Sequence, residues 1–302
     1  DRNSIVSVNT PTNFSATASS VVAPVTNPIV DPIVKGSTRV ELVTIADTMA
    51  APLQLIDPDD GTDRLFVVDQ AGQIRIIDNG ILLTTSFLDV ASQMVPLGLF
   101  DIDYDERGLL GAAFHPDFST ANSDGFGKIY TYTSEPNDIV ADFSVPMPPD
   151  TPFDHQSVVT EWQVDNGNAD IIDMTTARVI MRINQPQFNH NGGMMVFGPD
   201  GYLYISLGDG GSANDVDAGH SAIGNGQDTS NILGAIIRID PLDPTLTAGN
   251  GDPISSNGHY RVAITNPFVG VSGVDEIFAY GLRNPYRFSF DTGNLQSANP
   301  DS

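Results

Sequence analysis

Short apolar segments separated by turn residues constrain the fold of this chain more than any other feature. Residues 64–69 lead through a glycine-containing turn into residues 73–78, which predicts a hairpin. Residues 128–133 and 158–164 alternate apolar and polar side chains, as strands with one buried face do. Amphipathic segments longer than about two helical turns are missing from the sequence. The pattern, together with 28 Gly and 21 Pro, predicts an all-β protein.

Further strands are expected at residues 201–208, 235–240, 276–280 and 287–291. Many short strands with similar turns fit a sandwich, a barrel or a propeller. A weak internal repeat favours the propeller, because a turn, an aromatic residue and a β-rich run recur near residues 63 and 200. Pairs of a turn and a strand recur in any β protein, so this repeat alone leaves the sandwich and the barrel open.

The first 38 residues differ in composition from the rest of the chain. They are rich in Ser, Thr, Asn and Pro and show little hydrophobic periodicity, which indicates a disordered or linker-like segment. We expect the folded domain over residues 39–302. The chain begins with Asp1 rather than Met, which is compatible with a removed signal peptide.

The charge balance excludes several classes of partner. The chain carries 38 acidic and 13 basic residues, a formal net charge of -25. Such a surface repels nucleic acid and anionic lipid and attracts divalent cations, although solubility alone also explains it. The absence of cysteine excludes disulfides, thiolate zinc sites and cysteine nucleophiles. No apolar run approaches the roughly 20 residues of a membrane span.

Three segments place polar residues and glycines in loops between strong strands, where functional sites are usually built. They cover residues 105–118, 188–205 and 276–291. Together they resemble the soluble quinoprotein glucose/sorbosone dehydrogenase family, from about residue 40 to the end of the chain. The resemblance implies a six-bladed β-propeller that uses pyrroloquinoline quinone (PQQ) and calcium. It also implies an extracellular or periplasmic location.

His190 is the candidate general base. Oxidation of a sugar at its anomeric carbon removes a hydroxyl proton while hydride leaves the carbon, and histidine titrates in the right range for this step. Gly192 and Gly193 let the backbone approach a flat ligand. Taken alone, the His-Asn-Gly-Gly segment favours a His190 that caps a turn, whereas the resemblance implies the catalytic role. Asn189 stands where the family member best known for glucose oxidation has Asp, which suggests a weaker or differently tuned base.

Cofactor contacts are expected from three residues. The resemblance places Arg283 and Asn284 against the quinone oxygens, and a guanidinium and an amide suit such acceptors. A salt bridge at a blade end is the alternative for this pair. Glu106 matches a position where related enzymes often carry Gln near substrate and cofactor. A carboxylate beside an anionic cofactor requires compensation by Arg107 or a cation, and an exposed turn acid is the alternative.

A Gly-rich acidic loop follows the strand at residues 201–208. Asp209, Asp215 and Asp217 offer the hard oxygen ligands that calcium prefers, so the loop is a candidate structural calcium site. The bidentate Glu of an EF-hand is absent, and Asp side chains that cap turns are the alternative.

The remaining histidines give weaker signals. His115 lies between a buried-looking strand and a Pro turn, which favours a structural hydrogen bond. The other three lie in polar loops without partners at metal-ligand spacing, and they receive no assignment: His155, His220 and His259.

Strands for about four blades can be counted before Ser302, so we expect a propeller that is incomplete at its C-terminus. Two functions remain in view. The first is PQQ- and calcium-dependent oxidation of an aldose or related sugar, with electrons passed to an external acceptor. The second is a non-catalytic propeller that binds protein or glycan. A hydrolase is not supported, because no Gly-x-Ser-x-Gly elbow is present. The sequence leaves the substrate and the oligomeric state open.

Overall fold

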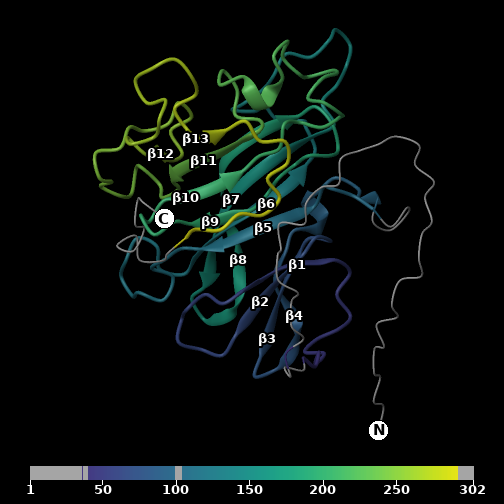
Figure 1. Cartoon of the computed structure of the whole chain (residues 1–302). Helices are drawn as coiled ribbons and strands as arrows, with labels where there is room; N and C mark the ends of the chain where they lie inside the picture. The colour runs from purple at the N-terminus through teal and green to yellow at the C-terminus, as the bar shows by residue number, and fades with distance from the viewer. Residues whose placement is uncertain (1–35, 37–39, 99–103, 292–302) are drawn as a thin grey trace, which may run out of the picture. The chain divides into compact units, whose positions relative to one another are not determined.

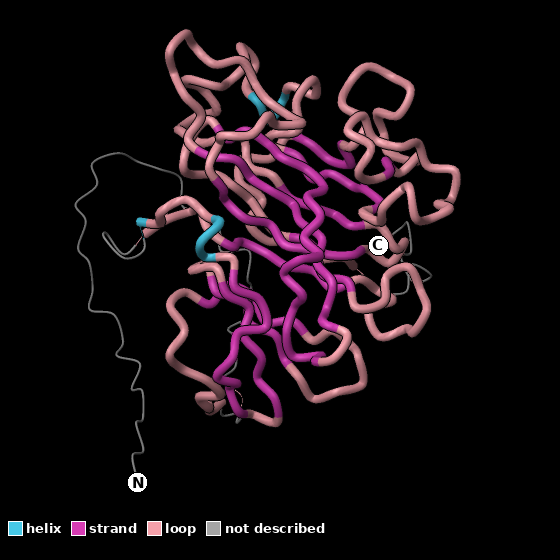
Figure 2. Tube along the Cα trace, turned by 180° about the vertical axis from the view of Figure 1, so that it is seen from behind, coloured by secondary structure: helices cyan, strands magenta, loops and turns pink. Residues whose placement is uncertain are grey.

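The computed structural model describes residue 36 and residues 40–98 and 104–291. Contacts divide the chain into residues 1–43 and 44–302, and every element below belongs to the second unit. The predicted linker-like segment lies outside the described residues except for Gly36. The described part is all-β apart from short 3-10 turns (Figure 2). None of its helices has the length and apolar character needed to cross a bilayer.

The first sheet is an antiparallel meander that follows the order of the chain. Its strands are β1 (Pro52–Ile56), β2 (Leu65–Asp69), β3 (Gln73–Asp78) and β4 (Ile81–Asp89). The pairing of β2 with β3 confirms the predicted hairpin. Its turn needs Gly72, which has φ +106°, and an added Cβ would lie 2.7 Å from the Ala91 backbone.

The second sheet repeats the meander with longer strands. It contains β5 (Leu109–Phe114), β6 (Lys128–Glu135), β7 (His155–Asp165) and β8 (Asn168–Gln185). We expected one exposed face for β6 and β7, and this expectation was wrong. Six of the eight residues of β6 are buried, polar Thr131 and Thr133 among them. Both faces of the sheet are therefore covered at β6 and over the first eight residues of β7.

Two hydrophobic cores, one on each face of this sheet, explain that burial. Ile129 and Trp162 pack into the core shared with the first sheet, whereas Tyr130 and Val159 pack into the core shared with the third. Successive side chains of a strand point to opposite faces, so one strand supplies both cores. A buried hydroxyl group on these strands has a hydrogen-bond partner: Trp162 Nε1–H donates to Thr131 Oγ1 at 2.9 Å.

The third sheet has its strands in the order β12-β11-β10-β9, with β13 also paired to β11. The strands are β9 (Met195–Phe197), β10 (Leu203–Ser206), β11 (Ala235–Asp240), β12 (Arg261–Val262) and β13 (Ile277–Tyr280). A strand at residues 287–291 was predicted wrongly, because this described segment pairs with no strand. There the Phe290 ring packs edge-on against Tyr204, with centroids 4.7 Å apart.

The first strands of the three sheets lie against one another, with β5 in contact with both β1 and β9 (Figure 1). This packing of antiparallel sheets around their first strands is consistent with a β-propeller. The described residues form three such sheets. The site described below lies in the loops β4–β5, β8–β9 and β10–β11 and in the segment after β13.

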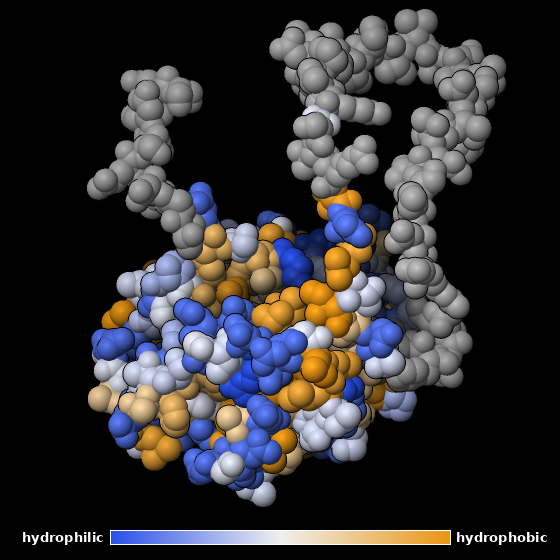
Figure 3. All heavy atoms as spheres, turned by 90° about the horizontal axis from the view of Figure 1, so that it is seen from below, coloured by the Kyte–Doolittle hydropathy of each residue, from blue (hydrophilic) through white to orange (hydrophobic). Residues whose placement is uncertain are grey.

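Part of the surface of this unit is apolar (Figure 3). Large exposed side chains include Leu55 of β1, Ile81 of β4 and Tyr280 of β13, which are 57%, 67% and 50% exposed. Single exposed apolar side chains are common on the surfaces of folded proteins.

Candidate functional site

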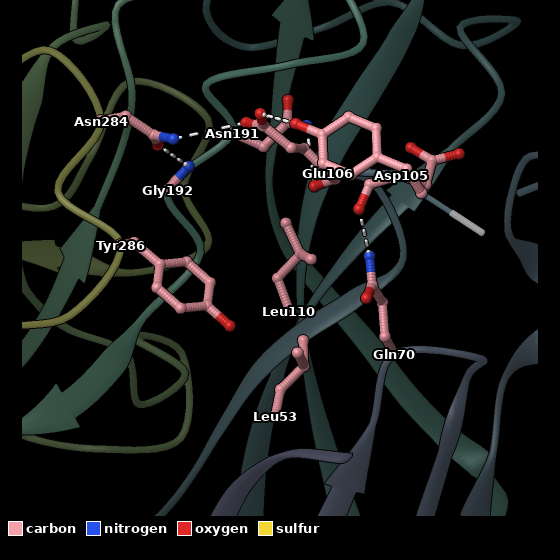
Figure 4. Close-up of a pocket in the computed structure, with 10 residues that line it drawn as sticks. Leu53, Gln70, Asp105, Glu106, Leu110, Asn191, Gly192, Asn284 and Tyr286 are labelled. Carbon is pink, nitrogen blue, oxygen red and sulfur yellow. Dashed lines mark hydrogen bonds between the residues drawn. The ribbon is translucent and has the colours of Figure 1, made fainter. Parts of the chain in front are cut away.

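The three segments singled out in the sequence meet at one carboxylate oxygen. Glu106 Oε2 accepts a hydrogen bond from the His190 backbone N–H at 2.6 Å and one from Asn284 Nδ2 at 3.3 Å. These partners are 84 and 178 residues away in the sequence. The structure therefore brings together three of the predicted site residues, of which Figure 4 shows Glu106 and Asn284.

A cavity of about 270 Å³ opens beside this junction. Its polar wall contains Glu106 and Asn284, while Leu53 and Leu110 form an apolar wall on the opposite side (Figure 4). The complete lining is Leu53, Gln70, Tyr104, Asp105, Glu106, Leu110, Asn191, Gly192, Asn284 and Tyr286. Such a combination of apolar surface and a few fixed polar groups is typical of a small-molecule site.

His190 is held from two sides. Its Nδ1 lies 2.6 Å from Asp209 Oδ1, and the two residues are 4% and 1% exposed. Its backbone has φ +57°, a conformation that side-chain-bearing residues rarely adopt. The loop with Asp209 comes close because residue 208 is glycine, where an added Cβ would lie 1.7 Å from the His190 carbonyl oxygen. A carboxylate at Nδ1 holds the proton there and leaves Nε2 as the acceptor.

Sequence reasoning missed the partnership of Asp209 with His190 and considered this Asp only as a calcium ligand. The Asp209 backbone is fixed by its N–H donor to the Arg283 carbonyl at 2.8 Å. Its Oδ1 also accepts the Gly211 N–H at 3.1 Å. The Gly-rich loop was visible in the sequence, but nothing in a separation of 19 residues indicates this pairing.

The other two acidic residues of that loop bond elsewhere. Asp215 accepts the backbone N–H groups of Asn225 at 2.8 Å and Gly226 at 2.9 Å, at the start of the short 3-10 helix Asn225–Gln227. Asp217 accepts the Ala218 N–H at 2.8 Å. Within the described ranges no group of three or more His, Cys, Asp or Glu could hold a metal ion. Calcium on Asp209, Asp215 and Asp217 stays a prediction.

Arg283 and Asn284 face different hollows, although they are adjacent. Asn284 lines the cavity, and its Oδ1 accepts the Gly192 N–H at 3.0 Å. Arg283 is exposed and lines a second hollow of about 190 Å³ together with Asp209 and Asp215. Its guanidinium makes no ion pair with any residue that the structure describes.

Arg107 does not compensate the charge of Glu106. It pairs with Asp105 (Nη2 to Oδ2, 2.9 Å) and with Asp154 (Nη1 to Oδ1, 3.2 Å). Burial raises the pKa of Asp105, but the hydrogen bonds and charge of Arg107 and the Gly98 N–H outweigh it and hold this pKa below its usual value. The Asp105 charge is therefore balanced within this pair.

The remaining histidines occupy structural positions. The predicted hydrogen bond of His115 is confirmed, because its Nδ1 accepts the Asp117 N–H at 3.0 Å. His155 is fully buried, with Nδ1 2.9 Å from Asp154 Oδ1. Burial lowers the pKa of His155 below its ordinary value. The His220 side chain is also buried, with Nε2 3.7 Å from Asp215 Oδ1.

The site could hold a flat, anionic cofactor on one side. Tyr286 and Leu110 supply flat and apolar surface and Asn284 supplies an amide in the first cavity, whereas Arg283 supplies a cation in the second hollow. This donor set fits a quinone that carries carboxylates. Glu106 has the wrong sign for contact with a carboxylate, so a carboxylate of the cofactor would have to lie at Arg283 in the second hollow.

Antiparallel sheets arranged around their first strands, with a buried His–Asp pair beside a polar cavity, define an all-β protein with a loop-built ligand site. The family model for glucose/sorbosone dehydrogenase matches residues 50–299. The chain belongs to this family.

The chain is also similar to curated proteins of animals and plants. It is 31% identical to Hedgehog-interacting protein of Mus musculus over 243 residues, which cover 80% of this chain and 30% of that protein. It is 31% identical to HIPL2 protein of Arabidopsis thaliana over 270 residues, which cover 80% of this chain and 36% of the relative. The chain thus spans about a third of the length of these relatives.

Solved structures share its fold. The PQQ-bound form of aldose sugar dehydrogenase from Streptomyces coelicolor superimposes with a TM-score of 0.51 at 22% identity. The superposition covers 80% of this chain and 54% of that one. This likeness agrees with the propeller arrangement of the sheets.

Proposed function

We propose that this chain carries the proton-abstracting part of a quinoprotein oxidoreductase site, which oxidises an aldose or related sugar at its anomeric carbon. The observation that carries the proposal is the buried contact between His190 Nδ1 and Asp209 Oδ1 at 2.6 Å. The His190 backbone N–H is bonded to Glu106, which lines the cavity, and Asp209 lines the second hollow beside Arg283.

The chemistry of the pair follows from its geometry. Asp209 accepts a hydrogen bond from the His190 Nδ1–H and thereby fixes the tautomer in which Nε2 can take the proton of the substrate hydroxyl. The same carboxylate then stabilises the imidazolium that forms. General-base assistance of this kind contributes about 10²–10⁴-fold to a rate. Asn189 is not required to orient the ring, because Asp209 does so.

When bound, PQQ with its calcium supplies the acceptor for the hydride that leaves the anomeric carbon. Arg283 and Asn284 would hold the cofactor, and the electrons would pass on to an external acceptor. The family membership and the fold shared with a PQQ-bound aldose sugar dehydrogenase support this assignment. A six-bladed propeller, of which the chain is one part, and an extracellular or periplasmic location belong to the same proposal.

A specific observation favours a second function. The chain is similar to Hedgehog-interacting protein, and the name of that relative states a protein ligand. On this alternative the propeller is non-catalytic and presents its loops to a protein or a glycan. The His190–Asp209 pair would then only fasten two loops together.

Cofactor binding separates the two functions. PQQ and calcium are titrated into the full-length protein, the cofactor absorbance is followed, and sugar-dependent dye reduction is measured. The His190→Ala protein should bind the cofactor without turnover, while His259→Ala, an exposed histidine outside the site, should behave like the wild type. Absence of micromolar cofactor binding would refute the oxidoreductase and favour the binding module.

A further inference from the structure

A third hollow is built from other residues than the site described above. Its volume is about 330 Å³, and it shares no lining residue with the cavity beside Glu106 or with the hollow beside Arg283. Two neighbouring carboxylates, Asp275 and Glu276, lie in its wall just before β13. This hollow has no part in the proposed reaction.

Glu276 is a buried carboxylate without a counter-charge. It is 6% exposed and lines the hollow. Its Oε1 accepts the Tyr260 hydroxyl at 2.6 Å, which is an uncharged donor. No described Lys, Arg or His forms an ion pair with it. Because little water screens a buried charge, the field of Glu276 acts strongly in the hollow.

Asp275 doubles the negative charge of this wall. Its side chain is half-buried, and its carboxylate has neither an ion pair nor a hydrogen-bond donor among the described residues. Burial raises the pKa of Glu276 above its ordinary value, the Tyr260 hydroxyl opposes this, and the Asp275 charge adds to it. A cation in the hollow would offset both the burial cost and the repulsion.

The arginines of the surrounding strands do not supply this cation. Arg182 of β8, Arg238 of β11 and Arg261 of β12 are each paired with another carboxylate. None of the three contributes to the pKa shift of Glu276. The two negative charges of the hollow are therefore left for a group from outside the described residues.

The rest of the lining is largely apolar and limits the kind of cation. It includes Phe143, Pro253, Ile254, Val262 and Val274. Ile254 is 58% exposed and Val262 is 4% exposed, so apolar surface extends from the outside to the interior. Calcium takes about 6–8 oxygen ligands, and these walls suit it poorly. A methylene stem that ends in a cation fits them better, because the stem covers apolar surface while the head meets the carboxylates.

We propose that this hollow is a docking site for a basic side chain, lysine or arginine, of a partner protein. The cationic head would lie at Asp275, in the field of Glu276, with the stem against the apolar wall. The net charge of -25 attracts a basic partner over a longer range and raises its association rate. This inference is independent of sugar oxidation.

Equilibrium binding of capped amino acids to the full-length protein tests the hollow. The probes are the Nα-acetyl methylamides of lysine, arginine and norleucine, and ligand-observed NMR at neutral pH gives their affinities. Norleucine is the matched uncharged probe, because it keeps the lysine stem without the ammonium group. We expect lysine and arginine to bind about tenfold more tightly than norleucine, as charge-assisted hydrogen bonds do. Higher ionic strength should reduce this ratio.

Substitutions locate the binding. Asp275→Asn should bring the ratio to within about threefold. Glu276→Gln keeps an acceptor for the Tyr260 hydroxyl and should have the same effect, and Asp275→Asn decides alone if Glu276→Gln does not fold. Asp63→Asn removes one charge from an exposed turn before β2 and should leave the ratio unchanged, which controls for the general attraction of cations.

Three results would overturn the inference. The first is equal affinity of the lysine and norleucine probes for the wild-type protein. The second is a ratio that Asp275→Asn reduces no more than Asp63→Asn does. The third is loss of lysine binding in millimolar calcium together with calcium binding that Asp275→Asn abolishes, since the hollow would then be a metal site.

Discussion

Two histidine–aspartate pairs among the described residues lie within hydrogen-bond distance, and their surroundings differ more than their geometry does. His190 and Asp209 are 2.6 Å apart, and His155 and Asp154 are 2.9 Å apart. The first pair joins two loops across 19 residues, and its backbone is bonded to a residue that lines the cavity. The second pair consists of sequence neighbours at the start of β7.

The second pair is closed to substrate. His155 is 0% exposed, and its Nε2 is buried without a partner among the described residues. Asp154 is also engaged by Arg107. A close His–Asp contact is therefore not sufficient evidence for a catalytic base. His190 differs in that its backbone N–H is bonded to Glu106, which lines the cavity, and its partner Asp209 lines the second hollow.

The largest expected effect comes from removing the carboxylate of each pair in turn. Asp209→Asn should reduce kcat by about 10³–10⁴-fold with little change in KM, because the amide no longer holds the productive tautomer. Asp154→Asn should leave kcat within a few-fold of wild type. Dye-linked kinetics on the PQQ- and calcium-loaded protein measure both. Equal losses in the two variants would remove the distinction between the pairs.

The next effect concerns the close approach of the two loops. Gly208→Ala places a methyl group 1.7 Å from the His190 carbonyl oxygen and should destabilise the fold. Overpacking of this kind costs about 1–3 kcal/mol. Gly201→Ala is the control, since its Cβ meets nothing within 4 Å and only the φ of +83° is unfavourable. Urea denaturation compares them, and a smaller loss in Gly208→Ala than in Gly201→Ala would contradict the steric argument.

The smallest effect is a pH dependence of stability that belongs to the second pair. Burial lowers the pKa of His155 below its ordinary value of 6.5, so the folded state favours the neutral ring. The unfolded state then binds more protons below pH 6.5, and this contribution to stability is present above that pH and lost as the pH falls. The slope approaches about 1.4 kcal/mol per pH unit for one proton.

His155→Asn should flatten this slope, whatever its effect on absolute stability. The free energy of unfolding is measured in urea between pH 7.5 and pH 5.5 for both proteins. Parallel pH profiles would show that His155 is not the group responsible. The Asp154 carboxyl, whose pKa is lowered by its bonds to His155 and by Arg107 despite burial, contributes at more acidic pH.

Local sequence determined the class of the fold and the identity of several site residues. Turn glycines and period-two apolar runs fix hairpins such as β2–β3, because turn conformation and side-chain alternation are local properties. The three sequence motifs contain His190, Glu106 and Asn284, and the structure connects these residues by hydrogen bonds to Glu106. Segment 287–291 had the same strand pattern, but without a pairing strand the pattern was not sufficient.

Tertiary structure alone decided the rest. The covered second face of β6 depends on a third sheet far along the chain. Asp209 could have capped a turn, bound a cation or held an imidazole, and only the placement of its loop beside His190 selects the last. In the same way, the separation of Arg283 from Asn284 follows from the path of the backbone past Asp209. The sequence determines which side chains are present, whereas the packing of the sheets determines how close loops from different parts of the chain come to one another.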